Sequence, residues 1–330
     1  MSLAARAITS RYILLRALRR ILLGDGVLEG ILSEQRLVRA FEFCKSWQLL
    51  GDVIKTDRAD IGQKYNGAKA RLREGNKHVS NRLLDVICEG NEVFLANGPM
   101  KYSDRKALWT LINEILINED YYFEADTSSP RILDCGTHFG LAIYYFKSLY
   151  PEARITGFEP VPELRQLALE NVYRNNYRNV EILPYALSDN EEAKTFILSK
   201  DDSMAGSLTD RRRNLGDDLV ELTVECRKLS RYLREPVHFL KMDIEGSEGP
   251  VLAEAERLLG NVWYLFCEYH HGLGLESDRL GKMLLLLDRA GFDTHVSKSF
   301  SHQLGSTRRP MSFVDHPYSA VIWAKNRNWN

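Results

Sequence analysis

The sequence predicts an α/β protein built on a mostly parallel sheet, and two motifs together with the pattern around them carry that prediction. The stretch from Arg131 to Gly140 reads RILDCGTHFG, which is a short apolar strand, a glycine turn and the start of a helix. The stretch from Gly157 to Pro160 reads GFEP and ends a second strand on a carboxylate. From Arg131 onward strand and helix patterns alternate, as in a parallel sheet covered by helices on both faces.

The region before the sheet reads as mostly helical up to about residue 100 and carries no catalytic motif. We therefore expect a helical accessory region over residues 1–103 and the main domain over residues 104–330. Residues 1–24 contain five arginines and no acid, with apolar side chains on one helical face. Such a helix packs on the body or on a second copy of the chain, lies on an anionic membrane surface, or is a targeting segment. The sequence leaves these options, and the oligomeric state, open.

The remaining elements follow in order along the main domain. A helix is expected over residues 104–118, and an extended piece over 121–123 leads into the sheet. Helices are expected over 138–149 and 161–175 and around 251–259 and 280–287, and about seven strands over 131–134, 154–158, 180–183, 237–242, 262–267, 292–296 and 320–324. Two more extended pieces, 193–198 and 219–226, flank a polar loop over 199–218, which we expect to act as a lid.

Composition and charge indicate which partners and which cellular location to expect. The 330 residues carry a formal net charge of −1, so we expect no nucleic acid as partner. The five cysteines are scattered without a C-x-x-C pair, which is typical of reduced thiols in a cytosolic protein. No apolar run approaches the roughly 20 residues of a membrane span. We expect a cytoplasmic protein, with peripheral membrane contact through residues 1–24 left open.

The glycine turn indicates which cofactor is bound. A dinucleotide site uses G-x-G-x-x-G, whereas this turn reads Asp134-x-Gly136-x-x-x-Gly140. A carboxylate at Asp134 would repel a pyrophosphate but suits the ammonium group of S-adenosylmethionine. Glu159, at the tip of the next strand, suits the two hydroxyls of a ribose. The alternatives are a nicotinamide-dependent oxidoreductase on a related sheet and turn glycines that serve packing only.

Four segments then occur in order within the stretch from Tyr121 to Val296. They read ILDCG at 132–136, GFEP at 157–160, PYALS at 184–188 and FLKMDIEGSE at 239–248. Together they resemble the FkbM family of S-adenosylmethionine-dependent methyltransferases. The resemblance implies a seven-stranded Rossmann-like methyltransferase sheet whose last strand is antiparallel. It also implies methyl transfer from S-adenosylmethionine, usually to a hydroxyl oxygen.

The resemblance assigns the cofactor side of the site by position. Asp134, Gly136 and Gly140 would line the methionine end, and the adenine edge would meet Ala186 and Leu187. The chain departs from the family pattern after the first glycine and near Leu229-Ser230, where an aspartate is usual. The full set of expected cofactor-binding residues is Asp134, Gly136, Thr137, His138, Gly140, Glu159, Pro160, Ala186 and Leu187.

The acceptor side is expected where the strands end. An alcohol is a poor nucleophile near neutral pH, so a base or a metal should help to remove its proton. We expect Asp243, Glu268 and His270 as catalytic residues, either as base and substrate contacts or as ligands of a divalent cation. Lys241 lies on the same side of its strand as Asp243, so it should pair with a carboxylate. Glu245 and Glu248 flank Gly246, where capping of a helix explains acids equally well.

The acceptor is predicted from the resemblance and from the residues of the late loops. The resemblance implies a hydroxyl of a sugar, a glycan or a small natural product. Aromatic and imidazole side chains suit a sugar face, and candidates are Tyr269, His270, His271 and His302, with Arg308 and Arg309. A domain that binds cofactor as a non-catalytic scaffold subunit is the alternative, although a scaffold has no need for the acids at the strand ends.

Overall fold

The computed structural model describes residues 84, 87–95, 97–199, 203, 204, 206–208, 218–271, 279–297, 300, 301 and 318–329. The chain divides into two compact units, Met1–Asn113 and Glu114–Asn330. The expected basic helix in residues 1–24, most of the lid and the late residues His302, Arg308 and Arg309 lie outside the described residues. In the part that is described, no helix is long and apolar enough to cross a membrane.

The first unit contains a small antiparallel sheet rather than more helix. Its strands are β1 (Cys88–Glu89), β2 (Glu92–Leu95) and β3 (Gly98–Lys101), paired in that order. In β2 the side chains of Val93 and Leu95 are buried while their neighbours are half-buried, which is the period of a strand. The expectation of helix up to about residue 100 was therefore wrong for this stretch, because a four-residue alternation is too short to outweigh the helical pattern before it.

The helix expected over 104–118 is present with a change of geometry along its length. Asp104 is its N-cap and accepts a hydrogen bond from the amide of Ala107 at 2.8 Å. The α-helix α6 (Arg105–Leu111) then continues as a π-helical segment, Ile112–Ile117. Such π-helical turns are rare in proteins, and many of those that occur lie at functional sites.

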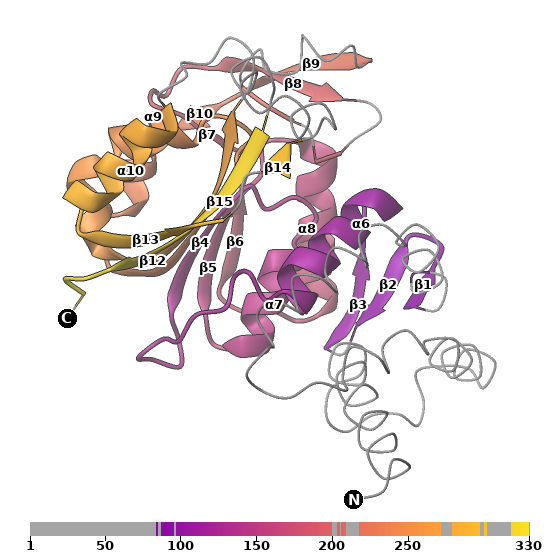
Figure 1. The fold of residues 1–330 in the computed structure, drawn as a ribbon. Coiled ribbons are helices and arrows are strands. Elements are labelled where there is room, and N and C mark those ends of the chain that lie inside the picture. Colours follow the sequence, from indigo (N-terminus) through magenta and orange to yellow (C-terminus); the bar gives the residue numbers. More distant parts are fainter. Residues whose placement is uncertain are drawn as a thin grey trace, which may run out of the picture. The chain divides into compact units, whose positions relative to one another are not determined.

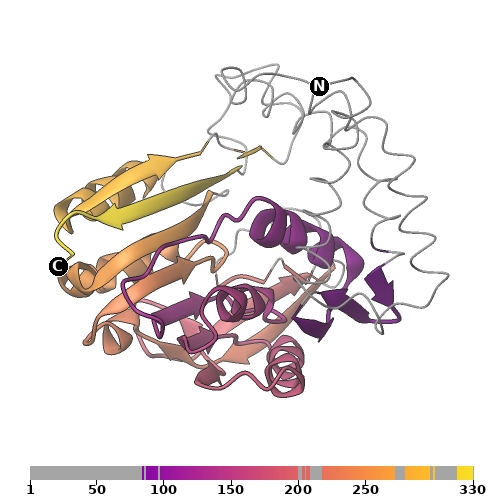
Figure 2. The ribbon, with the colours of Figure 1, turned by 90° about the horizontal axis from the view of Figure 1, so that it is seen from below.

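The second unit is built on the predicted sheet. The strands lie in the order β13 (Phe292–Val296), β15 (Tyr318–Asn326), β12 (Val262–His271), β11 (Val237–Met242), β4 (Arg131–Cys135), β5 (Arg154–Phe158) and β6 (Val180–Leu183). The strands from β12 to β6 are parallel, and β15 runs antiparallel to both neighbours. Figure 2 shows β13 and β15, in orange and yellow, side by side at one edge. A short strand, β14 (Phe300–Ser301), also pairs with β15. The predicted fold class is confirmed.

Helices cover both faces of this sheet, as the alternating pattern predicts. In Figure 1, α7 (Leu141–Leu149) and α8 (Pro162–Arg174) lie on one face, and α9 (Glu248–Glu254) and α10 (Arg279–Arg289) lie on the other. The 3-10 segments Leu229–Tyr232 and Glu256–Asn261 precede β11 and β12. Successive residues of β11 serve the two faces: Phe239 contacts Phe146 of α7, whereas Leu240 packs in a cluster with Val251 and Leu252 of α9.

Two smaller strand pairs lie outside the main sheet. β7 (Ala186–Leu187) pairs in parallel with β10 (Cys226–Arg227), and β8 (Lys194–Ser199) pairs antiparallel with β9 (Leu219–Val224). The two extended pieces expected around the polar loop are thus β8 and β9. They lie beyond the carboxyl ends of the parallel strands, at the top of Figure 1. The four cysteines that the structure describes are free thiols, as expected.

The centre of β11 should contribute strongly to stability. Leu240 is fully buried in the core cluster, so Leu240→Ala should lower the free energy of unfolding by about 2–5 kcal/mol through lost burial and a residual cavity. Leu285 on α10 is 62% exposed, so Leu285→Ala is a matched control that should change it by less than about 0.5 kcal/mol. Urea unfolding followed by circular dichroism measures both, and equal losses would contradict this view of the core.

Candidate functional site

The turn after β4 has a backbone that only particular residues allow. Gly136 has φ +90°, and a Cβ there would lie 2.0 Å from the carbonyl oxygen of Asp243, so no side chain fits. The amides of Gly136 and Thr137 both donate to the carbonyl of Phe158, at 3.1 and 3.0 Å. These contacts hold the turn between β5 and the end of β11, where the sequence places the cofactor.

Glu159 lies at the tip of β5 and is held by the same turn. Its carboxylate accepts hydrogen bonds from the amide of His138 at 2.8 Å and from the amide of Val161 at 3.0 Å. His138 reaches this position with φ +53°, a left-handed conformation that is uncommon for a residue other than glycine. Burial raises the pKa of Glu159 to about 7, although both amides and Lys241 act to lower it.

Lys241 contacts both the turn after β4 and the end of β11. Its buried ammonium lies 3.4 Å from Asp134 and 3.7 Å from Asp243, and it donates to the carbonyl of Gly136. The expected pairing of Lys241 with a carboxylate is thus confirmed, with two carboxylates in place of one. Neither oxygen of Asp134 has a hydrogen-bond partner in the described part of the chain, although the residue is fully buried. Such atoms are costly unless a ligand satisfies them.

A histidine surrounded by acids lies at the ends of β11 and β12. The Nδ1 atom of His270 lies 3.0 Å from Glu248, and its Nε2 atom lies 3.5 Å from both Glu245 and Glu268. Asp243, Glu245 and His270 each offer a ligand atom, and these three atoms lie within 4.8 Å of one another. The strand β12 extends four residues beyond the predicted end at residue 267, so Glu268 and His270 share a face of it.

Glu248 lies in the first turn of α9, where an acid complements the helix dipole, and it also faces the site. It is 1% exposed, and it accepts a hydrogen bond from the amide of Gly246 at 2.9 Å while facing His270. Glu245, three residues before Glu248, has φ +56°, so the loop Asp243–Gly246 holds a strained backbone.

The acids also shift one another's pKa values. Burial alone would lower the pKa of His270, but Glu245, the hydrogen bond to Glu248 and the charge of Glu268 raise it to about 10. Burial and the charge of Asp243 raise the pKa of Glu268 to about 7. Glu114 in the π-helical segment was not predicted: burial, Glu268 and Asp243 raise its pKa well above the usual value. No local motif distinguishes Glu114, so only its three-dimensional neighbours reveal it.

The polar loop contacts both sides of the site where the structure describes it. The Oγ atom of Ser203 lies 3.1 Å from Nε2 of His138, and the hydroxyl of Ser207 donates to the carbonyl of Glu245 at 2.6 Å. Ser207 is fully buried and bridges to Ile197 of β8 through two backbone hydrogen bonds. Ser203 therefore contacts the turn after β4, and Ser207 contacts the loop Asp243–Gly246.

Other expected site residues lie further from this cluster or within the core. Ala186 and Leu187 are buried in two neighbouring hydrophobic clusters. The ring of His271 stacks on Tyr318 with centroids 4.8 Å apart, and the hydroxyl of Tyr269 lies 3.2 Å from His271. Both His271 and Tyr269 are thus engaged with neighbours.

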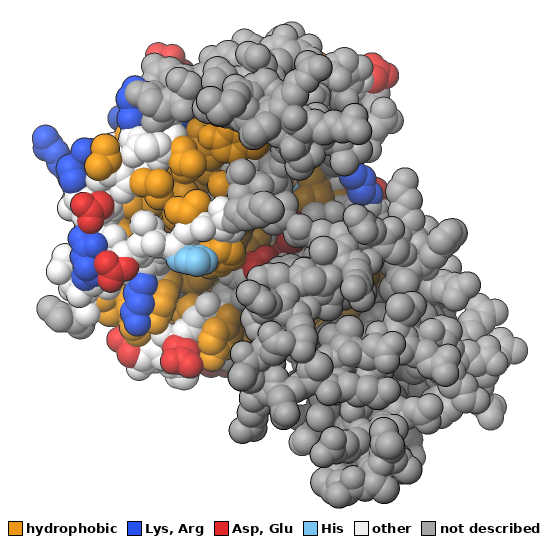
Figure 3. Space-filling view, viewed as in Figure 1, with side chains coloured by type: hydrophobic (Ala, Val, Ile, Leu, Met, Phe, Trp, Pro, Cys, Tyr) orange, Lys and Arg blue, Asp and Glu red, His pale blue; other side chains and the backbone are white. Residues whose placement is uncertain are grey.

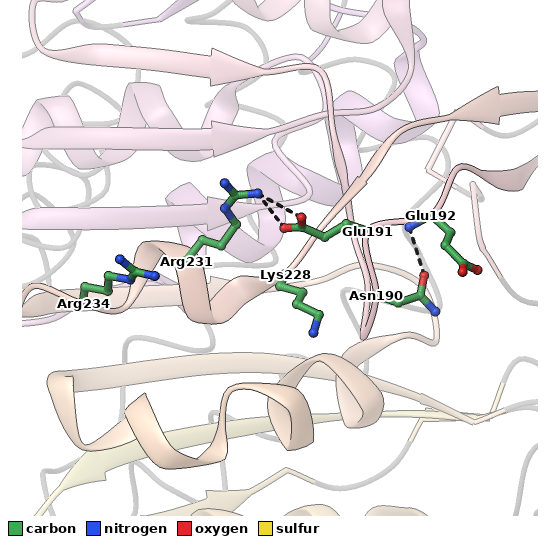
Figure 4. Close-up of a pocket in the computed structure, with 6 residues that line it drawn as sticks. All are labelled: Asn190, Glu191, Glu192, Lys228, Arg231 and Arg234. Atoms are coloured by element: carbon green, nitrogen blue, oxygen red, sulfur yellow. Dashed lines mark hydrogen bonds and ion pairs between the residues drawn. The ribbon is translucent and has the colours of Figure 1, made fainter.

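A separate groove of about 700 Å³ lies beside the connection from β7 to β8. Figure 4 shows the Arg231 guanidinium reaching the Glu191 carboxylate, with hydrogen bonds of 2.8 and 3.0 Å. Its lining contains none of the expected site residues and consists of Asn190, Glu191, Glu192, Lys228, Arg231 and Arg234. The two acids offset much of the positive charge there, so the groove is no strong anion site.

An open sheet with these five parallel strands and an antiparallel strand inserted at one edge is the architecture of Rossmann-like methyltransferases. Residues 134–294 match the family described as the methyltransferase FkbM domain. This part of the chain is therefore an FkbM-family methyltransferase domain, which confirms the resemblance seen in the motifs. The matched family is one of methyltransferases and not of nicotinamide-dependent oxidoreductases.

Two curated relatives and one solved structure are similar to parts of this chain. Methyltransferase sdnD of Sordaria araneosa is 28% identical over 174 residues, covering 43% of this chain and 66% of that protein. The 2-O-methyltransferase NoeI of Sinorhizobium fredii is 26% identical over 155 residues, covering 42% and 63%. The crystal structure of methyltransferase FkbM from Methylobacillus flagellatus matches with a TM-score of 0.37 and 17% identity, over 66% of this chain and 56% of that one. The chain thus spans less than two thirds of each of these relatives.

The close approach at Gly136 generates one prediction. Gly136→Ala should weaken binding of S-adenosylhomocysteine, because the added methyl group meets the Asp243 carbonyl and the backbone has positive φ. Gly281→Ala on α10 serves as control, because a Cβ built at Gly281 would meet no other atom within 4 Å. Isothermal titration calorimetry gives the affinities and thermal unfolding reports the fold. Equal affinities of the two variants would show that the turn tolerates a side chain.

A second prediction concerns pH. The pKa of free Glu159 is near 7 because burial disfavours its charge, whereas ribose hydroxyls donate to the ionised form. Affinity for S-adenosylhomocysteine should therefore fall as pH is lowered through 7, approaching about tenfold per pH unit. The folding stability of the free protein has the opposite pH dependence. Because the pKa of Glu159 is raised in the folded state, its contribution to stability is present below about pH 4.5 and is lost as pH rises through 7.

Calorimetry between pH 6 and 8 tests this, and Glu159→Gln is the control because an amide does not titrate. The variant should bind more weakly at pH 8 and show a nearly flat profile. A pH profile in the variant that matches the original protein would assign the titration to another group.

Proposed function

We propose that this protein is an S-adenosylmethionine-dependent O-methyltransferase that acts on a hydroxyl of a sugar, glycan or small natural product. The observation that carries the proposal is the pair of adjoining half-sites at the carboxyl ends of β4, β5, β11 and β12. One half has the turn and ribose carboxylate of a nucleoside site, and the other has acids and a histidine next to it. Lys241 contacts both halves.

The donor half fits S-adenosylmethionine through its own residues. Glu159 is fixed by two amides, so its carboxylate is already oriented to accept hydroxyl hydrogen bonds. The buried oxygens of Asp134 have no hydrogen-bond partner among the described residues, and a cationic donor molecule suits them. Gly136, Thr137, His138, Gly140 and Pro160 line the same turn, with Ala186 and Leu187 proposed at the adenine edge. When bound, S-adenosylmethionine would supply a methyl group from its sulfonium sulfur, which becomes a neutral thioether.

Asp243 is the residue that we propose next to the reacting hydroxyl. It ends β11, its side chain is 18% exposed, and its backbone carbonyl already contacts the cofactor turn. A carboxylate there accepts the proton that the hydroxyl loses as the oxygen–methyl bond forms. His270 is less suited to act alone because both ring nitrogens face carboxylates. His270 and Glu268 are proposed to orient the acceptor or to bind a cation that polarises it.

The charge of the acceptor half supports a neutral hydroxyl compound. Asp243, Glu245 and Glu268 would repel a nucleic acid or another phosphate-rich acceptor. On the described part of the face in Figure 3, Lys and Arg side chains are interspersed with Asp and Glu and form no continuous track. The relative named 2-O-methyltransferase NoeI supports oxygen as the atom methylated.

A labelling experiment tests the proposal. The protein is incubated with S-adenosylmethionine that carries an isotopically labelled methyl group and with a metabolite and glycan extract, and products are identified by mass spectrometry. Label should appear as a methyl ether on a hydroxyl compound. Asp243→Asn should lower turnover by about 10²- to 10⁴-fold, with S-adenosylhomocysteine still bound.

Asp288→Asn is the matched control, because Asp288 is 69% exposed and pairs only at the surface with Arg327 among the described residues. It should turn over at the original rate. Label found only in protein or RNA would overturn the proposed acceptor, and unchanged turnover of Asp243→Asn would remove Asp243 from the mechanism.

A further inference from the structure

The acids beside His270 are arranged around a common point. Asp243 and Glu245 follow β11 on one loop, and His270 comes from the end of β12, so two separate elements supply the three ligand atoms. The atoms lie within 4.8 Å of one another, and opposite ligands of an octahedral Mg²⁺ would lie about 4.2 Å apart, so shifts of a few tenths of an ångström would bring the three atoms onto one ion. Their side chains are 18%, 17% and 4% exposed, so the group is partly shielded from water.

The orientation of His270 is an independent indication of a metal. Buried Glu248 holds Nδ1 at 3.0 Å, and this fixes the ring so that Nε2 points at Glu245 and Glu268. Glu248 is fixed in turn by the amide of Gly246. In metal sites a carboxylate commonly holds one ring nitrogen of a histidine while the other nitrogen binds the metal.

Oxygen ligands are plentiful at this site. Five carboxylates gather here, namely Asp134, Asp243, Glu245, Glu248 and Glu268, and among the described residues Lys241 and His270 form ion pairs with them. Glu248 faces His270, and Lys241 is shared between Asp134 and Asp243. Carboxylate oxygens gathered in this way suit a hard divalent cation.

We propose that Asp243, Glu245 and His270 Nε2 bind one divalent cation of the Mg²⁺ or Mn²⁺ class, with Glu248 as the group that orients His270. This ligand set replaces the sequence-based expectation of Asp243, Glu268 and His270, since Glu245 and not Glu268 meets the mutual distances. Carboxylate oxygens with one imidazole suit a hard divalent ion, and no cysteine joins the set. The role of the ion in polarising the acceptor hydroxyl rests on the proposed methyl transfer, whereas its binding does not.

Manganese binding tests the site directly. The full-length protein is freed of metal with a chelator and titrated with Mn²⁺, and electron paramagnetic resonance measures the free ion. One Mn²⁺ per chain should bind. Glu245→Gln should weaken this binding by at least about tenfold, and Glu248→Gln, which disturbs only the orienting group, by about 10- to 100-fold.

Glu256→Gln is the matched control, because Glu256 is half-exposed and pairs with Arg289 away from this cluster. It should bind Mn²⁺ as the original protein does. Calorimetry with S-adenosylhomocysteine checks that each variant is folded on the donor side, and Mg²⁺ should compete with Mn²⁺. Binding that Glu245→Gln abolishes supports the site even if no methyl ether forms.

Two results would overturn the proposal. One is the absence of stoichiometric Mn²⁺ binding, in which case the imidazolium of His270 itself neutralises the acids. The other is binding with equal affinity in Glu245→Gln and the control, which would place the ion elsewhere. Either result leaves the labelling experiment on methyl transfer unaffected, so failure of the metal site and failure of the proposed function are distinguishable.

Discussion

The buried ammonium of Lys241 is the interaction on which the rest of the site depends. It lies on β11 between Asp134 of β4 and Asp243 and donates to the carbonyl of Gly136. Removing one partner of a buried ion pair leaves an uncompensated charge, which typically costs about 3–5 kcal/mol. The pairing of β4 with β11 aligns Asp134 with Lys241 directly, so sheet register and charge balance enforce each other. The turn after β4 and the loop Asp243–Gly246 are therefore both held by one side chain.

Backbone conformation adds a second constraint that side-chain chemistry alone does not explain. Gly136 lies against the carbonyl of Asp243, while His138 and Glu245 both have positive φ. Each strained residue is held by a contact from a distant part of the chain: the amide of His138 by Glu159, and the carbonyl of Glu245 by Ser207. Strain of this kind persists only where surrounding contacts over-determine it. The two loops that meet at the site are thus held by Glu159, which follows β5, and by Ser207, which pairs with Ile197 of β8.

The sequence reveals the repeating and local parts of this structure and not the long-range ones. Strand and helix periodicity predicted seven of the eight strands of the main sheet, all but the short β14, and the motifs placed Asp134, Glu159 and Asp243 at strand ends. The continuation of β12 through His271 was missed because polar residues interrupt its apolar run, although β15 pairs with it that far. The strands before residue 102 were missed because their alternation is short. Glu114 carries no local signal, since a single glutamate in a helical stretch is ordinary and only Asp243 and Glu268 beside it make it distinctive.

The sharing of Lys241 also means that the two halves of the site are not electrostatically independent. The ammonium lies at similar distances from Asp134 and Asp243, 3.4 and 3.7 Å, so a change of charge near one carboxylate alters the pairing of the other. In water such coupling over a few ångströms would be weak, but both partners and the lysine are largely removed from solvent, which strengthens it. A cationic methyl donor beside Asp134 would therefore bias Lys241 toward Asp243 at the moment when an acceptor must be deprotonated there. After transfer the sulfonium charge is gone, and the same lysine would return toward Asp134. The proposed donor and acceptor sides would thus be coupled through the ammonium of Lys241.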